Sequence, residues 1–304
     1  MELRQLRYFV AVGEEQHYGR AARRLHVAQP ALSRQIQNLE EEIGFKLFDR
    51  LPRGVKINAA GKLFLEDACR ILKDLNEAAA TAKRIGSGLA GTLRIGYVQS
   101  LSWHGIIPDS LRHFRQGRPD VELQLKPLGS SEQIAAVQSG ALDAGYVYCM
   151  GKVARELGQL QVGLVQLVLA IPAGHALAKL KNLRLKDLID ASFILFPRRA
   201  SPVLYDRLMV ECARGGLKAP RVVQESADES IMLSMVACGI GVAIVSSASQ
   251  WRHPPGITLS PVTDLNLQLP FVLIWRADNR SPLLSNFIAD VTSVVERQAG
   301  ETNP

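Results

Sequence analysis

The stretch Ala28–Gly44, AQPALSRQIQNLEEEIG, predicts a single helix with two unlike faces. Apolar residues recur every three or four positions, as on the buried side of an amphipathic helix. Pro30 suits the first turn, where its missing N–H costs nothing, and Gly44 suits the end of a helix. The apolar positions are Leu32, Ile36, Leu39 and Ile43.

The other face of this helix carries amide, hydroxyl and guanidinium groups. Such groups bond base edges and phosphates, and an α-helix fits the major groove of DNA. An ordinary amphipathic surface helix would show the same pattern, so the helix alone leaves both interpretations open. The residues on this face are Pro30, Ser33, Arg34, Gln37 and Asn38.

The residues before Ala28 predict two further helices that pack against it. Apolar residues between Leu3 and Val10 form an inward stripe, and Arg20–Leu25 begins with small residues that allow close helix contact. Two short helices joined by a tight turn, the second with a polar outer face, make a helix-turn-helix.

A basic hairpin is predicted directly after this motif. Residues 45–57 read FKLFDRLPRGVKI, in which Pro52 and Gly54 indicate a turn between two apolar pairs. Arg50, Arg53 and Lys56 lie on this expected wing. A basic wing beside a recognition helix can contact phosphates or enter the adjacent minor groove, although three solvated surface charges are the simpler alternative.

A long helix is predicted next, with Asn58 as its N-cap. Apolar residues alternate steps of three and four up to about Arg84, which is a heptad seam and implies a partner helix. The sequence does not decide between parallel and antiparallel pairing. Gly86, Gly88 and Gly91 predict a hinge after it. The seam residues are Leu65, Ala68, Leu72, Leu75, Ala79 and Ala82.

From Thr92 onward the chain alternates short apolar strands with helices. The first β-α-β-α-β run predicts a mostly parallel sheet, and a second set predicts a similar half, with a ligand cleft between the two halves. The expected strands are 92–98, 121–126, 142–148, 164–171, 193–196, 221–225, 241–245 and 270–275, and the expected helices are 106–117, 132–139, 185–189, 203–214, 230–237 and 283–297.

The composition is that of a globular protein whose first 90 residues are basic. The 304 residues suit two or three domains, and 47% are hydrophobic. The net charge is +7; residues 1–90 hold 15 basic against 11 acidic residues, which favours a polyanion partner there. The first residues lack the features of a signal peptide, and the longest apolar run, near 162–172, is too short for a bilayer. We therefore expect a cytoplasmic protein.

No catalytic constellation is present in the sequence. The four cysteines, Cys69, Cys149, Cys212 and Cys238, have no metal-ligand or Cys-x-x-Cys spacing, so we expect buried thiols in a reducing compartment. The six histidines show no ligand spacing, and there is no nucleophile elbow, Walker A loop or dinucleotide fingerprint. We expect no enzyme activity, no metal and no cofactor.

A longer signature resembles the N-terminal domain of LysR-type transcriptional regulators. It runs from Ala21-Ala22 and Leu25 through Gln29–Ser33, Ile36, Leu39-Glu40, Ile43-Gly44, Leu47-Phe48 and Arg50 to Ala60-Gly61. The opening MELRQLRYFVAV and the run RQIQNLEEE are similar to regulators of aromatic-acid catabolism of the benzoate- and muconate-responsive type.

The resemblance implies a fold, a set of partners and a domain order. The fold is an N-terminal all-α winged helix-turn-helix with a long linker helix, then a two-lobed α/β effector domain like periplasmic binding proteins. The expected domains are 1–58, 59–91 and 92–304, with one lobe at about 92–161 plus 268–304 and the other at about 162–267. The implied partners are an inverted-repeat promoter site on double-stranded DNA, a small-molecule effector, RNA polymerase, and copies of the chain in a dimer or a dimer of dimers.

The expected DNA-binding residues lie on the recognition helix and the wing. Gln29, Ser33, Arg34 and Gln37 are expected to face the major groove, with Arg53 near the minor groove. The full set is Gln29, Pro30, Ala31, Ser33, Arg34, Gln37, Arg50 and Arg53.

The expected effector site lies at three strand ends. Serine hydroxyls and backbone N–H groups near helix starts suit an anion, and apolar residues would form the walls. These features favour a small carboxylate with an apolar or unsaturated body, such as an aromatic acid or its ring-cleavage product. Arg198 or Arg199 could add a charge. The expected residues are Ser100, Leu101, Ser102, Trp103, Ser130, Phe196, Pro197, Pro202 and Leu204.

The chain departs from the family pattern at four positions. Gly19 and Ala28 stand where the family often has helix-capping serine or threonine, so both caps are expected to be weak. Leu204 replaces an aromatic residue, and Tyr148 replaces an arginine that some relatives use for a second ligand site. These differences bear on whether benzoate itself is the effector and whether the second site exists.

The leading interpretation is an effector-responsive transcription factor, an activator. The alternatives are a regulator of the same family for an unrelated metabolite, a solute-binding protein, and an enzyme built on the α/β domain. The DNA-binding head argues against the solute-binding protein. Turnover of a candidate ligand would indicate an enzyme.

Overall fold

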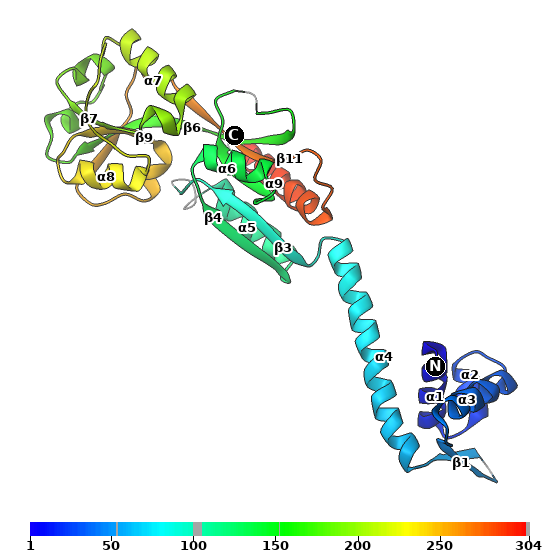
Figure 1. Ribbon diagram of the computed structural model, residues 1–304. Coiled ribbons are helices and arrows are strands. Elements are labelled where there is room, and N and C mark those ends of the chain that lie inside the picture. The colour runs from blue at the N-terminus through cyan, green and yellow to red at the C-terminus, as the bar shows by residue number, and fades with distance from the viewer. Residues whose placement is uncertain (53, 100–104, 152, 302–304) are drawn as a thin grey trace. The chain divides into compact units, whose positions relative to one another are not determined.

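The computed structural model describes residues 1–52, 54–99, 105–151 and 153–301, arranged in two compact units, Met1–Arg84 and Ile85–Pro304. The division falls within the long helix that the heptad pattern predicts. Figure 1 colours the first unit blue to cyan and the second cyan to red. Each unit has hydrophobic clusters of its own.

The first unit contains three helices, a hairpin and the long helix. Its core is built from the apolar stripe of the recognition helix, including Leu32, Ile36 and Leu39, packed on Phe9 and Val12 of the first helix. These five side chains are fully buried. The elements are α1 (Leu3–Glu15), α2 (Tyr18–Arg24), α3 (Gln29–Ile43), β1 (Phe48–Leu51), β2 (Gly54–Ile57) and α4 (Ala59–Gly86).

The boundaries of α3 and α4 follow the sequence signals. Pro30 lies in the first turn of α3, and Gly44 ends the helix in the left-handed conformation at φ 90°. The Asn58 side chain accepts the Gly61 N–H at 2.8 Å, which caps α4 as predicted. Gly61 is itself required, because a Cβ there would lie 2.3 Å from the Leu47 carbonyl oxygen.

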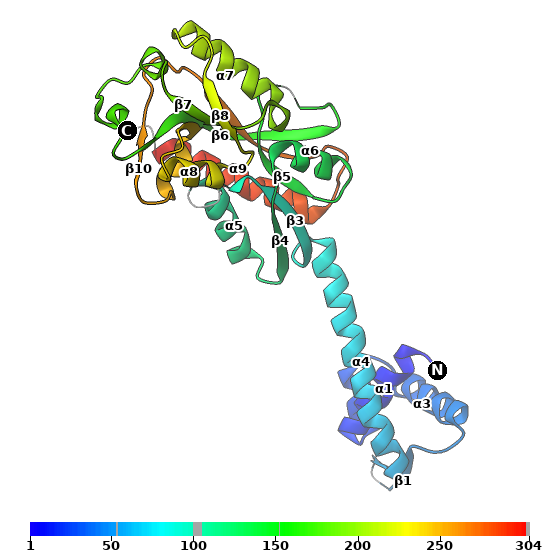
Figure 2. The ribbon, with the colours of Figure 1, turned by 60° about the vertical axis from the view of Figure 1, so that its left-hand side comes forward.

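The second unit holds a nine-stranded sheet with helices on both faces, seen in Figure 2. The strand order is β4-β3-β5-β11-β6-β9-β7-β8, and β10 pairs with β6. Its strands are β3 (Gly91–Tyr97), β4 (Val121–Pro127), β5 (Ala144–Tyr148), β6 (Leu157–Pro172), β7 (Ser192–Leu195), β8 (Arg221–Glu225), β9 (Val242–Ser246), β10 (Ile257–Ser260) and β11 (Gln268–Arg276).

The sheet is mixed rather than mostly parallel overall. The β-α-β-α-β run does form a parallel group, since β3 pairs in parallel with β4 and β5, and β7 likewise pairs with β8 and β9. The two groups are joined through β6 and β11, which run antiparallel to their neighbours. Strand β10 lies outside the predicted set, because ITLS is too short and too polar to signal a strand.

Alternating side chains divide each parallel group into two hydrophobic layers. In the β7-β8-β9 group, Phe193 and Ile244 face one helix, whereas Ile194 and Ala243 face another. The helices of the unit are α5 (Ile106–Gly117), α6 (Ser130–Gln138), α7 (Pro202–Arg214), α8 (Glu229–Ala237) and α9 (Pro282–Glu301), with short 3-10 turns η2 (Ala176–Lys179), η3 (Leu185–Leu188), η4 (Arg198–Ala200) and η5 (Ser247–Trp251).

Candidate DNA interface and effector site

The outer face of α3 is open for contact. Gln29, Pro30, Ala31 and Arg34 are exposed, and Ser33 and Gln37 are half-buried. No ion pair between described residues involves Arg34. The helix begins at Ala28 without a side-chain cap, as its sequence predicts.

The cap of α2 differs from the prediction. His17, not Gly19, is the N-cap residue, and its Nδ1 accepts the backbone N–H groups of Gly19 at 3.0 Å and Arg20 at 3.4 Å. Histidine is not among the residues that usually cap helices, so no capping pattern predicted it at this position. The start of α2 is therefore capped despite the missing serine or threonine.

The wing is the hairpin β1–β2, with Leu51 paired to Gly54. The Val55 N–H donates to the Gln16 carbonyl oxygen at 3.1 Å, which fixes the hairpin on the turn between α1 and α2. Gly54 has φ 107°, and a Cβ there would lie 2.8 Å from the same oxygen. Arg50 and Lys56 are exposed on the strands; Arg53 lies outside the described residues.

A buried carboxylate fixes the wing to the recognition helix. Glu40 is only 6% exposed, and one of its oxygens accepts the backbone N–H groups of Leu47 at 2.8 Å and Phe48 at 3.3 Å. The other oxygen pairs with the Lys46 ammonium at 2.9 Å. Glu40 also contributes to raising the pKa of the half-buried Tyr18 hydroxyl to about 12, although burial is the larger cause.

Replacing Glu40 with Ala should weaken the attachment of the wing to α3. Two buried N–H groups would lose their acceptor, at a cost of about 2–3 kcal/mol. Hydrogen exchange of the full chain, followed by mass spectrometry, should show faster exchange in peptides covering residues 44–57. Glu41→Ala, an exposed neighbour, is the matched control and should leave the exchange unchanged. Equal protection in Glu40→Ala and wild type would contradict the role given to this carboxylate.

The heptad seam of α4 divides into two parts. Leu65, Ala68 and Leu72 pack in the core of their own unit, and a Cβ on Gly13 of α1 would lie 3.1 Å from Leu65. Ala79 is exposed and Leu75 is half-buried; Ala82 is also exposed. A second chain would therefore meet the later part of the seam rather than its whole length.

The expected effector residues that the structure describes lie at the start of α6 and on either side of η4, and one hydrogen bond joins these two places. The Ser131 hydroxyl donates to the Ala200 carbonyl oxygen at 3.3 Å, which brings the start of α6 next to η4. Pro197 is buried before η4, while Phe196 and Leu204 are half-buried on the adjoining cluster. Pro202 is exposed at the start of α7. Ser100, Leu101, Ser102 and Trp103 lie outside the described residues.

The first turn of α6 leaves backbone donors for an anion. Its N-cap is Gly129, which provides no side-chain cap, and Glu132 accepts the Gly129 N–H at 2.9 Å. The Ser130 hydroxyl accepts the Tyr148 N–H at 3.0 Å, and no hydrogen bond to another described residue uses its own proton. Tyr148 stands where some relatives have an arginine, and its hydroxyl donates to Ser246 at 3.2 Å. Its side chain therefore links β5 of one strand group to β9 of the other.

Arg198 and Arg199, the two candidate cations near η4, differ in whether a carboxylate already binds them. Arg198 is held by the Asp206 carboxylate at 2.7 and 2.8 Å, an exposed two-point contact that raises the pKa of Arg198. Arg199 is exposed and takes part in no ion pair between described residues. Of the two, Arg199 is therefore better suited to add a charge to the site.

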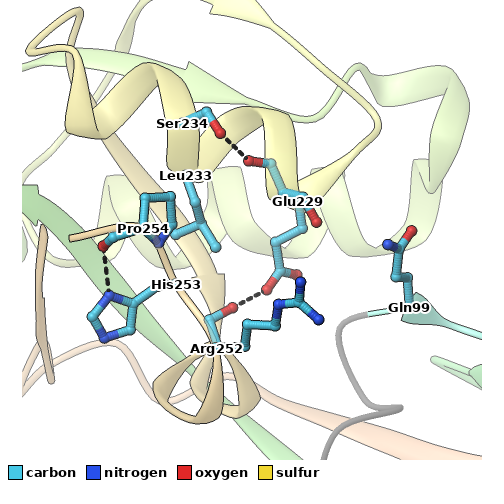
Figure 3. Close-up of a pocket in the computed structure, with 9 residues that line it drawn as sticks. Gln99, Glu229, Leu233, Ser234, Arg252, His253 and Pro254 are labelled. Carbon is cyan, nitrogen blue, oxygen red and sulfur yellow. Dashed lines mark hydrogen bonds between the residues drawn. The ribbon is translucent and has the colours of Figure 1, made fainter.

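A pocket that the sequence did not predict lies beside α8. It has a volume of about 490 Å³ and is lined from α8, from η5 with the residues after it, and by Gln99. Figure 3 shows the Glu229 side chain reaching across it from α8. No sequence signal placed Glu229 here, because its surroundings come from segments about twenty residues further along the chain.

The thiols do not form the buried set that the sequence suggested. Cys212, on α7, is buried in the core, but Cys69 and Cys238 are exposed and Cys149 is half-buried. All four are free. Within the part of the chain that the structure describes, no helix is long and apolar enough to cross a membrane.

A winged helix-turn-helix followed by an α/β unit with a ligand pocket defines a DNA-binding regulator that senses small molecules. Comparison with known protein families, which match nearly the whole chain, supports this class. Residues 3–62 match the bacterial regulatory helix-turn-helix protein, lysR family, and residues 86–295 match the LysR substrate binding domain. The chain belongs to the LysR family of transcriptional regulators, which is a family of regulators and not of enzymes.

Individual relatives span the full chain. The HTH-type transcriptional regulator AlsR of Bacillus subtilis is 34% identical over 289 residues, covering 95% of this chain and 94% of that protein. The HTH-type transcriptional regulator BenM of Acinetobacter baylyi is 33% identical, covering 100% and 99%. The crystal structure of full-length CbnR complexed with its target DNA matches with a TM-score of 0.83 and 27% identity, covering 97% and 100%.

Proposed function

We propose that this regulator is an activator that responds to a small carboxylate with an apolar or unsaturated body. The observation that carries the proposal is the first turn of α6, where backbone N–H groups have no side-chain cap and no hydrogen bond to another described residue uses the Ser130 hydroxyl proton. A helix N-terminus of this kind attracts anions. Phe196 and Leu204, both half-buried, are apolar residues on either side of η4, which the start of α6 contacts.

Other relatives that span the chain are also transcriptional regulators. ClcR of Pseudomonas putida and TfdS of Cupriavidus pinatubonensis are HTH-type regulators 32% and 34% identical to the chain, each over 95% of it. The other effector class that remains open is an unrelated metabolite. It would use the same α6 terminus if it were anionic, so charge is the property to be tested first.

The experiment is a calorimetric titration of the full chain with a panel of benzoate, salicylate and cis,cis-muconate, with the matching uncharged amides as controls. We expect at least one carboxylate to bind and its amide to bind at least tenfold more weakly. Equal binding of an acid and its amide, or no binding by any acid, would contradict the proposed effector class.

The regulator is further proposed to act in the cytoplasm as a dimer or a dimer of dimers on an inverted repeat. Two recognition helices brought together by an isologous contact would meet the two halves of such a site. The exposed later part of the α4 seam supports this contact. Pairing of Arg34 and Gln37 with bases, and of Arg50 and Arg53 with the DNA backbone or minor groove, belongs to the same proposal.

Replacing Ala79 with Asp should weaken the assembly, because it places a charge in an apolar contact between copies. We expect the light-scattering mass to fall toward that of a smaller species at micromolar concentration. Thr81→Asp adds the same charge to an exposed position on the opposite side of α4 and should leave the mass unchanged. An unchanged mass for Ala79→Asp would exclude this part of the helix as the interface.

A further inference from the structure

The second unit carries a group of exposed cations at one end of its β7-β8-β9 group. Strand β6 ends, and β7, β8 and β9 begin, at this end, because Ala170 of β6 pairs with Ala243 of β9, which lies beside Ile194 of β7. Phe196 and Pro197, of the expected effector site, follow β7 at the other end. The cations lie on the segments that lead from β6 to β7 and from α7 into β8. We call them the basic end, which consists of Lys179, Lys181, Arg184, Lys186, Lys218 and Arg221.

The two segments that form the basic end pack against each other. Leu185 of η3 is buried in the same hydrophobic cluster as Leu217, which follows α7. A Cβ on Gly215 would lie 2.5 Å from the Leu185 side chain, and a Cβ on Gly216 would lie 3.6 Å from the Lys186 Cβ. The turn after α7 therefore brings the cations that follow it next to those around η3.

Buried neighbours hold these cations at the surface. Leu183 and Leu185 are buried, whereas Arg184 and Lys186, which alternate with them, are exposed. The Leu183 carbonyl oxygen accepts the backbone N–H of Thr263 at 2.8 Å and its hydroxyl at 3.1 Å. The segment is therefore fixed to the unit, and its cations form a lasting part of the surface.

No carboxylate pairs with the basic end. None of its six cations takes part in an ion pair between residues that the structure describes. The nearby carboxylates bond to the backbone instead. Asp187 accepts the Arg184 N–H at 2.9 Å, and Asp264 accepts the Leu185 N–H at 2.9 Å. Exposed cations gathered on one surface produce a positive potential that attracts a polyanion.

We propose that the basic end binds the phosphate backbone of double-stranded DNA that flanks the operator. The chain belongs to a DNA-binding family, so duplex DNA is present at a high local concentration whenever the first unit is bound to its site. Lysine and arginine contact phosphates without regard to base sequence. The basic end therefore adds affinity and salt dependence to DNA binding and adds no sequence preference. This role does not depend on which effector the chain recognises.

The test compares the affinity of the full chain for two duplexes. One is the operator selected from random DNA by the wild-type chain, and the other is the same operator with about 40 base pairs of unrelated sequence on each side. We expect wild type to bind the longer duplex at least tenfold more tightly at about 50 mM salt. Most of this advantage should be lost at about 200 mM salt, because two phosphate contacts account for about a tenfold change over that range.

Neutralising the basic end should remove most of this advantage. The triple variant Lys181→Gln/Arg184→Gln/Lys186→Gln should bind the short operator within about twofold of wild type, which also shows that it is folded. The matched control is Arg155→Gln/Arg280→Gln/Arg297→Gln. It removes three exposed cations of the same unit that lie outside the basic end and take part in no ion pair between described residues. This control should keep the advantage of wild type.

Comparison among the three proteins isolates the basic end, because the first unit contributes the same non-specific binding to the longer duplex in each of them. A second flanking sequence should give the same advantage as the first, as backbone contacts require. The proposal is overturned if wild type binds the two duplexes equally, if the triple variant keeps the full advantage, or if the advantage depends on the flanking sequence. A basic end that binds an acidic protein instead of DNA would give the first of these results.

Discussion

Replacing Arg34 with Ala should weaken operator binding by about 1–3 kcal/mol, or ~5-fold to ~150-fold. Arg34 is exposed on the outer face of α3 and takes part in no ion pair between described residues, so its guanidinium can reach a base edge or a phosphate. If it contacts a base, the loss should be concentrated on one position of the operator. If it contacts a phosphate, the salt dependence of binding should become shallower.

The measurement is a fluorescence-polarisation titration at several salt concentrations, with an operator selected from random DNA by the wild-type chain. Arg7→Ala is the matched control, because Arg7 is an exposed cation of α1 in the same unit and lies outside the predicted contact set. Arg7→Ala should bind within about twofold of wild type. Wild-type affinity for Arg34→Ala at every salt concentration would exclude Arg34 from the interface.

Replacing Ser131 with Asp should remove carboxylate binding while leaving α6 intact. An aspartate in the first turn stabilises a helix, but it places a negative charge where the carboxylate is proposed to bind. We expect affinity for the tightest-binding carboxylate of the panel to fall about tenfold or more, given the strength of a like-charge contact near a protein surface.

Ser131→Asn is the matched control for this change. Asparagine has the size of aspartate and no charge, and both variants lose the hydrogen bond from Ser131 to the Ala200 carbonyl oxygen. Calorimetry should therefore show a much smaller loss for Ser131→Asn than for Ser131→Asp. If the two variants lose affinity equally, the hydrogen bond between α6 and η4 matters and the charge does not, and the proposed anion site is wrong.

Local signals in the sequence predicted most of the fold. Pro30 and Gly44 set the ends of α3, and the succession of short strand-like and helix-like segments predicted β8 at Arg221–Glu225 and α5 at Ile106–Gly117. These features depend on neighbours within a few positions, which a single sequence contains. The signature from Ala21 to Gly61 then gave the family, which the matches over residues 3–62 and 86–295 confirm.

Features that depend on distant contacts could not be predicted in this way. The sheet is mixed because β11, near the end of the chain, inserts between β5 and β6. Leu65 and Leu72 fit a heptad seam, yet the same stripe packs on α1, which no periodicity can distinguish from a partner helix. Glu229 is hydrogen-bonded to Ser249 in the segment that follows β9, so its place in a pocket has no local signal.

The central claim is that two copies of α3 read two related half-sites of DNA. In vitro selection from a random DNA library with the full-length chain tests it most directly. We predict enrichment of an inverted repeat with half-site centres separated by about one helical turn or a multiple of it, and loss of that enrichment in a parallel selection with Arg34→Ala. Selection of no common sequence by the wild-type chain, or of the same repeat with undiminished enrichment by Arg34→Ala, would contradict the claim.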